Sequence, residues 1–389
     1  MAGKLPIGIQ SFEKVREEGY LYVDKTAFVY RLAHEGAPYF LSRPRRFGKS
    51  LLVSTLRAYF EGRRELFSGL EIERLEGEGP DAWAPHAVFH FDFTGRNYLE
   101  EGALEAALDS HLARWEAEWG IESGGPGGRL LGDRFWNLLA AAHARTGRRC
   151  AVLVDEYDKP LLEAMDDPAL QDRNRAVFKS FFGVLKGADE HIRFAFLTGV
   201  TKFSKVSVFS DLNQLRDISM VKEYAGICGV TSDELVGVFS DEVDGLAEEM
   251  GLARGKCLER LEAMYDGYCF CAGGPHVYNP FSLLNAFADR KLGSYWFESG
   301  TPTFLVRKLR EIAFDVRKLT DGTLWASGGA ISDYRAENPD PLPLLCALSP
   351  GEIAAVCLNI FPRGSCNART FPRGNPAREG RFPRGSCHG

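Results

Sequence analysis

The stretch Arg43-Pro44-Arg45-Arg46-Phe47-Gly48-Lys49-Ser50 decides the fold that this sequence predicts. A short apolar run, residues 37–42, precedes it. Apolar residues then recur with helical spacing at Leu52, Leu56, Tyr59 and Phe60. The pattern predicts a strand, a basic loop and a helix between residues 37 and 60.

The loop fits the phosphate-binding P-loop motif except at its first position. In that motif, backbone N–H groups at a helix start hold phosphate, the lysine reaches the β and γ phosphates, and the hydroxyl binds Mg²⁺. Gly48, Lys49 and Ser50 supply three of these parts. Arg43 stands where the motif has a glycine that permits a tight turn, which leaves the loop geometry open. The alternative reading is an ordinary helix start with an exposed lysine.

Further strands and helices alternate along the chain. Residues 88–93 alternate apolar and polar side chains, whereas 150–154 and 193–199 are continuous apolar runs of the kind found in buried parallel strands. Helical patterns cover 100–119, 135–145 and 174–186, with a Gly-rich loop at 123–128. We therefore expect an α/β fold, a P-loop NTPase core with a parallel sheet flanked by helices.

Two acids, Asp155 and Glu156, end the strand predicted at 150–154. Asp155 is expected to hold Mg²⁺ directly or through water, and Glu156 to polarise the attacking water. An acidic turn at the end of a strand is the alternative. Thr198 ends the next strand and would reach the same sheet edge, where it would sense the γ phosphate or merely cap its strand.

The remaining residues of the loop complete the expected nucleotide site. Arg45 and Arg46 would add positive charge at the phosphates, or form a solvated face. The expected ATP-binding residues are Arg45, Arg46, Phe47, Gly48, Lys49, Ser50 and Thr198; the expected Mg²⁺ ligands are Ser50 and Asp155; and the expected catalytic residues are Lys49 and Glu156.

Composition narrows the functional classes. The chain has 389 residues, 45% hydrophobic and 26% charged, with a net charge of −6. These values are typical of a globular protein, and they exclude a nucleic-acid footprint spread over the whole surface.

Without a signal peptide or an 18-residue apolar run, we expect a cytoplasmic protein with no membrane association. Nine cysteines without CxxC spacing argue against a zinc ribbon, and we expect Cys150 and Cys228 to be buried as small apolar residues.

The organisation changes twice along the chain. Residues 1–226 carry the α/β pattern, and residues 227–337 predict a smaller, mostly helical subdomain with helices at 232–249 and 255–264. Residues 338–389 begin with a Pro-rich cluster and repeat Phe-Pro-Arg-Gly at 361–364, 371–374 and 382–385. We expect this irregular, low-complexity tail to be disordered.

Several ordered blocks resemble the bacterial AAA-ATPase-like family. Beside the loop, they are Leu5-Pro6-Ile7-Gly8, Tyr22-Val23-Asp24-Lys25-Thr26, Val154-Asp155-Glu156-Tyr157-Asp158-Lys159-Pro160, Leu197-Thr198-Gly199-Val200-Thr201-Lys202-Phe203-Ser204, Tyr265-Asp266-Gly267-Tyr268, Tyr278-Asn279-Pro280-Phe281-Ser282 and residues 295–302. The resemblance runs from about Leu5 to about Leu344. In this family an arginine-rich loop without the first glycine is usual, and Lys49, Ser50, Asp155 and Glu156 match its nucleotide-site motif.

The resemblance implies an ATPase that uses ATP and Mg²⁺. Typical members continue into a nuclease domain of the PD-(D/E)XK superfamily, whose carboxylates and lysine bind Mg²⁺. Here only Glu352 and Glu379 are acidic after Leu345, and no lysine follows Lys318. We therefore expect no nuclease activity, and a tail that is the product of a frameshift or a premature end.

The expected function is Mg-ATP binding and hydrolysis coupled to a conformational change that acts on an unknown partner, a protein or DNA. One alternative is a nucleotide-gated binding switch with little intrinsic hydrolysis, for which no arginine finger is assigned. Another is a truncated remnant of an ATPase-nuclease protein. The sequence leaves the oligomeric state open.

Overall fold

A computed structural model describes residues 3–36, 38–79, 81–121, 130–200, 214–266, 268–271, 273–293 and 295. Its centre is a five-stranded parallel sheet in the order β2-β3-β4-β1-β5. The strands are β1 (Pro38–Ser42), β2 (Val88–Asp92), β3 (Cys150–Asp155), β4 (Ile192–Gly199) and β5 (Arg216–Asp217). The expected α/β fold with a parallel sheet is confirmed.

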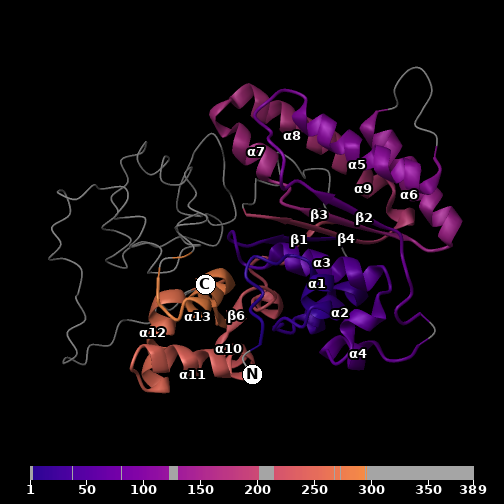
Figure 1. The fold of residues 1–389 in the computed structure, drawn as a ribbon. Coiled ribbons are helices and arrows are strands. Elements are labelled where there is room, and N and C mark those ends of the chain that lie inside the picture. Colours follow the sequence, from indigo (N-terminus) through magenta and orange to yellow (C-terminus); the bar gives the residue numbers. More distant parts are fainter. Residues whose placement is uncertain are drawn as a thin grey trace.

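Helices cover both faces of this sheet (Figure 1). One layer holds α1 (Phe12–Glu17), α2 (Thr26–Glu35), α3 (Lys49–Phe60) and α4 (Glu71–Glu76). The other holds α5 (Ala103–Trp119), α6 (Leu131–Thr146), α7 (Lys159–Glu163), α8 (Pro168–Phe182) and α9 (Val184–Gly187). Short 3-10 helices lie at Arg64–Phe67, Ala164–Asp166, Asp189–His191 and Lys222–Tyr224. The right-handed crossovers of parallel strands place helices on both faces in this way.

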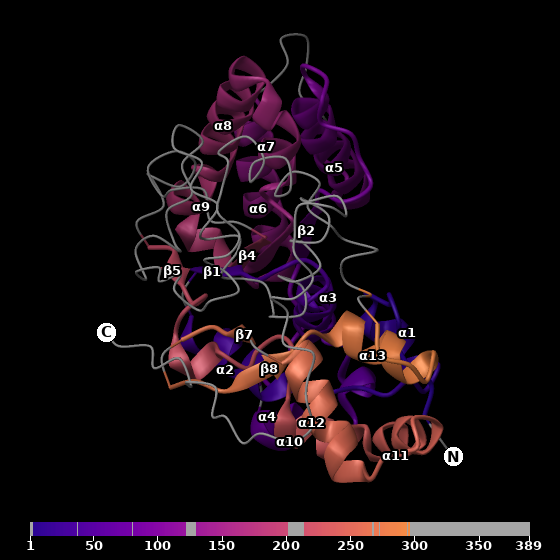
Figure 2. The ribbon, with the colours of Figure 1, turned by 90° about the vertical axis from the view of Figure 1, so that its left-hand side faces the viewer.

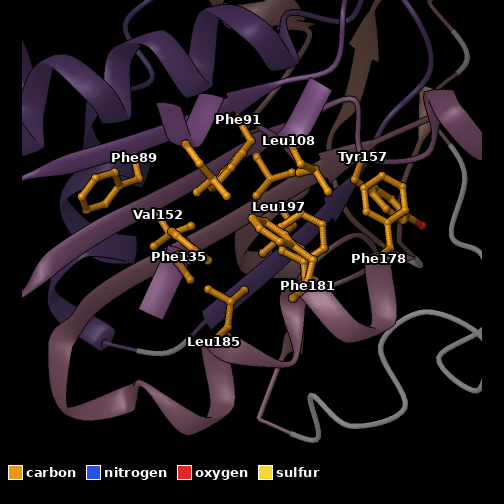
Figure 3. Close-up of a cluster of buried hydrophobic side chains, with 14 of the residues drawn as sticks. Phe89, Phe91, Leu108, Phe135, Val152, Tyr157, Phe178, Phe181, Leu185 and Leu197 are labelled. Carbon is orange, nitrogen blue, oxygen red and sulfur yellow. The ribbon is translucent and has the colours of Figure 1, made fainter. Parts of the chain in front are cut away.

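Aromatic side chains fill the space between the sheet and the α5–α9 layer (Figure 3). Phe91 of β2 meets Trp115 of α5 edge-on, with ring centroids 4.8 Å apart, and Phe135 of α6 at 5.1 Å. Edge-to-face pairs of this kind add to the free energy gained by burying the rings. Because this core holds β3 and β4 rigidly, it also holds the residues that end these strands.

The helical subdomain packs beside the α1–α4 layer (Figure 2). It contains α10 (Ser232–Val238), α11 (Ser240–Glu249), α12 (Arg254–Tyr265) and α13 (Pro280–Ala288). A small antiparallel sheet accompanies them, with β6 (Val230–Thr231), β7 (Tyr268–Cys269) and β8 (His276–Tyr278) in the order β6-β8-β7. The sequence predicted helices at 232–249 and 255–264, where α10, α11 and α12 lie, but it predicted neither α13 nor this sheet, whose strands are only two or three residues long.

Local signals explain where several helices begin. Asp167 and Asn279 each precede a proline at the helix start and accept a backbone N–H, so they cap α8 and α13. Thr231 and Glu234 form a capping box at α10. The predicted helix 232–249 is divided into α10 and α11 at Phe239, which is buried in the core of the subdomain.

Some expectations fall outside the described residues. They are the loop at 123–128, the block Thr201-Lys202-Phe203-Ser204, the end of the subdomain after 295 and the tail at 338–389. The predicted burial of Cys150 and Cys228 is confirmed.

Candidate nucleotide site

The loop between β1 and α3 has the geometry of a helix N-terminus that can hold an anion. Gly48 caps α3 with φ 91°, a left-handed conformation that glycine adopts without strain. Arg46 also has a positive φ of 65°. The α3 helix is 12 residues long, so its first backbone N–H groups and positive dipole end face the loop.

Arg43 explains why the loop does without its first glycine. Its φ is not positive, so a Cβ is tolerated, and its backbone N–H donates to the Gly199 carbonyl (3.2 Å). The side chain, 2% exposed, turns away from the loop. The guanidinium lies 3.8 Å above the ring of Phe270 and donates to three backbone carbonyls, those of Ser42 (2.9 Å), Ser219 (2.7 Å) and Tyr224 (3.2 Å). Burial lowers the pKa of Arg43 to about 10, which still leaves it charged at neutral pH.

Lys49 is the first residue of α3 and is 5% exposed. Its ammonium donates to the carbonyls of Arg43 (2.9 Å) and Pro44 (3.0 Å), so it is held over the loop. Burial lowers the pKa of Lys49, whereas the negative charges of Asp155 and Glu156 act in the opposite direction. A cation and two carboxylates from distant parts of the sequence therefore share one region.

Asp155 and Thr198 meet across neighbouring strands. The Thr198 hydroxyl, fully buried, donates to Asp155 Oδ1 (2.6 Å), and the backbone N–H of Glu156 donates to the same oxygen (3.1 Å). Thr198 thus reaches the carboxyl edge of the sheet as predicted. Its hydroxyl is bound to Asp155, which favours orienting this carboxylate over direct contact with phosphate.

Glu156 has a positive φ of 52°, an uncommon conformation for a residue with a side chain. Burial raises the pKa of Glu156, and Lys49 opposes this rise. Strained backbone beside a buried acid is frequent at functional sites.

A cavity of about 540 Å³ opens in front of these residues. Residues 45–52 and Glu156 line its polar end. Its other walls come from the N-terminal segment, including Ile9 and residues 21–23, and from the subdomain, including residues 227–230 and Phe281. Asp155 is absent from this lining.

The other predicted loop residues divide between core and cavity. The Phe47 side chain is buried against Tyr268 (4.7 Å between ring centroids) and Phe270 (5.5 Å), so only its backbone can serve an anion. Arg45 and Arg46 are exposed, and the Arg46 guanidinium lies 4.8 Å above the ring of Phe281. Ser50 lines the cavity beside Lys49. Sequence reasoning missed the residues of the subdomain that complete this site, since only the fold brings them to the loop.

The described residues contain no cluster of three or more His, Cys, Asp or Glu side chains able to hold a metal ion. A Mg²⁺ ion held by one or two protein oxygens together with phosphates and water needs no such cluster. Of the helices that the structure describes, none combines the length and apolarity needed to cross a membrane.

Comparison with known proteins supports this picture. The family model described as "Predicted AAA-ATPase" matches residues 6–209, which contain the loop, Asp155, Glu156 and Thr198. The chain is also 43% identical over 312 residues to an uncharacterized protein in the vnfD 5′ region of Azotobacter chroococcum mcd 1. That match covers 79% of this chain but only 56% of the relative.

Proposed function

The chain belongs to the family of predicted AAA-ATPases, and we propose that it binds Mg-ATP in the 540 Å³ cavity and hydrolyses it. One observation carries the proposal. Lys49 at the start of α3 is close enough to Asp155 and Glu156, the acids at the end of β3, for their negative charges to act on its ammonium. All three lie at the carboxyl edge of a parallel sheet. Ligands of open α/β sheets bind at this edge.

The loop would hold the phosphates. Backbone N–H groups of residues 46–50 lie at the positive end of α3, and Lys49 adds a full charge to them. Its two carbonyl partners are loop carbonyls, so the ammonium can exchange them for phosphate oxygens with little movement. Arg45 and Arg46 add charge at the exposed rim.

The Ser50 hydroxyl and the Asp155 carboxylate are the oxygens that would hold Mg²⁺. They fit the ion, because Mg²⁺ binds protein through one or two oxygens and keeps several waters. Since Asp155 does not line the cavity and its Oδ1 is bound to Thr198, a water between the carboxylate and the ion is favoured over direct contact. When bound, Mg²⁺ neutralises negative charge on the phosphates.

Glu156 would orient the attacking water. It lines the cavity, whereas its neighbour Asp155 does not. Its pKa is raised by burial, so its ionised form is a better proton acceptor than an exposed glutamate. The adenine ring of ATP would pack against the apolar part of the cavity wall, which comes from Ile9, residues 21–23 and Phe281.

ATP binding and phosphate release with Mg²⁺ test the proposal. Lys49→Ala should lose turnover, and Glu156→Gln should lose turnover while it keeps binding. Lys14→Ala, an exposed lysine of α1, is the matched control and should behave as the wild type. Retained turnover in Lys49→Ala would contradict the assignment.

A nucleotide-gated switch with little hydrolysis is the second candidate. It is favoured by the contacts of Arg43, Arg46 and Phe47 with residues 268–281, since these link the loop to the subdomain. Binding without turnover in the wild type would support this switch, whose partner, a protein or DNA, stays a proposal.

A further inference from the structure

The segment Tyr22-Val23-Asp24-Lys25-Thr26 resembles a family signature, yet the proposed chemistry gives it no role. Its acid and hydroxyl fix it to the core. Asp24 Oδ1 accepts from the backbone N–H (2.8 Å) and hydroxyl (2.6 Å) of Thr26, and Oδ2 accepts from the Glu71 N–H (2.8 Å) at the start of α4. The Thr26 hydroxyl in turn accepts from the Ile72 N–H (3.1 Å). The segment is therefore rigidly joined to α2 and α4.

Lys25 points from this segment into the subdomain. Its ammonium donates to both carboxylate oxygens of Glu234 (2.6 and 2.7 Å) and to the Gly226 carbonyl (2.7 Å). An ammonium has three protons, and these three acceptors match them. The residue is only 9% exposed. A buried charge with so complete a set of partners fixes the relative position of the groups it joins.

Glu234 links Lys25 to the start of α10. Its Oε2 also accepts from the backbone N–H of Thr231 (2.8 Å), as part of the capping box that begins the helix. Gly226, the other acceptor, directly precedes residues 227–230 of the cavity wall. One side chain thus holds both the start of α10 and the turn that precedes β6.

The same lysine lines the nucleotide cavity. Residues 21–23 form the wall on its own side, and residues 227–230 form the wall on the side of its partners. The ion pair therefore ties the two walls together at their base. Since its ammonium is committed to Glu234 and Gly226, Lys25 acts on a ligand through the walls and not by contact with phosphate.

We propose that Lys25 is a positioning residue for the nucleotide: its pair with Glu234 holds the helical subdomain against the N-terminal segment and keeps the two walls of the cavity in place. The effect of Lys25 on nucleotide affinity rests on the proposed function. The attachment of the helical subdomain through the Lys25–Glu234 pair does not depend on that function, so it can be measured without nucleotide.

Hydrogen exchange of the nucleotide-free protein tests the hold. In Lys25→Met, which keeps the unbranched apolar part of the side chain but removes the ammonium, backbone amides of α10 and α11 should exchange at least tenfold faster, with β3 unchanged. Glu234→Gln keeps the capping acceptor and should give the same result, so the test survives if Lys25→Met fails to fold. Lys256→Met makes the same substitution at an exposed lysine of α12 and should leave exchange unchanged. We call Lys25→Met and Glu234→Gln the junction variants. Unchanged exchange of the α10 and α11 amides in both of them would overturn the proposal.

Titration calorimetry and steady-state kinetics test the consequence for nucleotide. Both junction variants should raise the Mg-ATP dissociation constant and KM about tenfold or more, with kcat within about threefold of the wild type, because the phosphate site is untouched. Lys25→Arg keeps a charged donor fork for Glu234 and should recover most of the affinity. Faster exchange with unchanged affinity would overturn the positioning role. Wild-type protein that binds no Mg-ATP would contradict the proposed function, while the exchange result would still decide the hold on the subdomain.

Discussion

The Thr198 hydroxyl donates to Asp155 Oδ1 at 2.6 Å, across the neighbouring strands β4 and β3. The threonine is fully buried, and Asp155 accepts a second bond, from the Glu156 N–H. The carboxylate is thereby held in one orientation. Outer partners of a metal-binding carboxylate set its geometry and are nearly as important as the ligand itself.

Thr198→Val keeps the shape of this side chain and removes its hydroxyl. We expect Mg²⁺ affinity in ATP hydrolysis to fall about 10- to 100-fold. The loss of a hydrogen bond to a charged group should also cost about 1.5–3 kcal/mol of unfolding free energy. The Mg²⁺ dependence of phosphate release and urea unfolding measure the two effects. Thr146→Val, at the exposed end of α6, removes a hydroxyl bonded to the Ala142 and Arg148 carbonyls and is the control for the metal effect. An equal fall of Mg²⁺ affinity in both variants would contradict the role of Thr198.

Arg43→Gly restores the glycine of the common P-loop motif, yet it should destabilise this protein. The carbonyls of Ser219 and Tyr224 would lose their buried donor, at about 1–3 kcal/mol each, and the ring of Phe270 would lose its cation. We expect a loss of about 3 kcal/mol or more in urea unfolding. Arg45→Gly changes an exposed neighbour and should cost less than about 1 kcal/mol. A stable Arg43→Gly protein would show that the buried guanidinium is dispensable.

The pKa of Glu156 is raised above its ordinary value of 4.5 by burial, and this predicts two effects of pH. In the proposed role of Glu156, turnover needs the ionised acid, so turnover should fall on acidification at a higher pH than an ordinary glutamate would cause. A raised carboxyl pKa also means that stability is lost as pH rises through it, since the buried charge is disfavoured. Glu156→Gln should therefore be more stable than the wild type at neutral pH and equal to it in acid. A pH–rate profile and urea unfolding at several pH values check both effects.

Burial lowers the pKa of His111 from 6.5 to about 4, beside the Asp92 carbonyl and Trp115. Because the unfolded chain binds the proton more readily, stability is complete above pH 6.5 and is lost as pH falls from 6.5 toward 4. His111→Phe removes the titrating group and should flatten this acid dependence. Urea midpoints at pH 7.5 and 5 measure it; the same acid dependence in the variant would assign it to other groups.

The parts of the fold with long, periodic patterns could be predicted from the sequence. The strand, loop and helix around Lys49 and the apolar runs that became β3 and β4 were predicted within a few residues. Since strands 150–155 and 192–199 lie side by side, the expected meeting of Asp155, Glu156 and Thr198 at one edge is confirmed as a matter of geometry. The catalytic and metal roles of these residues stay predictions.

Contacts between distant segments could not be predicted. Nothing local to Arg43 shows that its guanidinium reaches Ser219 and Tyr224, because only the packing of the subdomain brings these carbonyls to it. Phe47 was expected beside a ligand, yet its ring is buried on Tyr268. The Lys25 partner Glu234 is 209 residues away, and a single sequence read by itself offers no signal that joins them.

The packing of the loop on the subdomain constrains how this protein can evolve. Three loop side chains contact aromatic rings of the subdomain: Arg43 contacts Phe270, Phe47 contacts Tyr268 and Arg46 contacts Phe281. A substitution on one side of these contacts therefore requires a compensating substitution on the other. Among relatives, these positions should change in concert. A recombination event that joins the first 226 residues of one relative to the remainder of another would carry mismatched pairs into the loop between β1 and α3, and natural crossovers at that point should be rare.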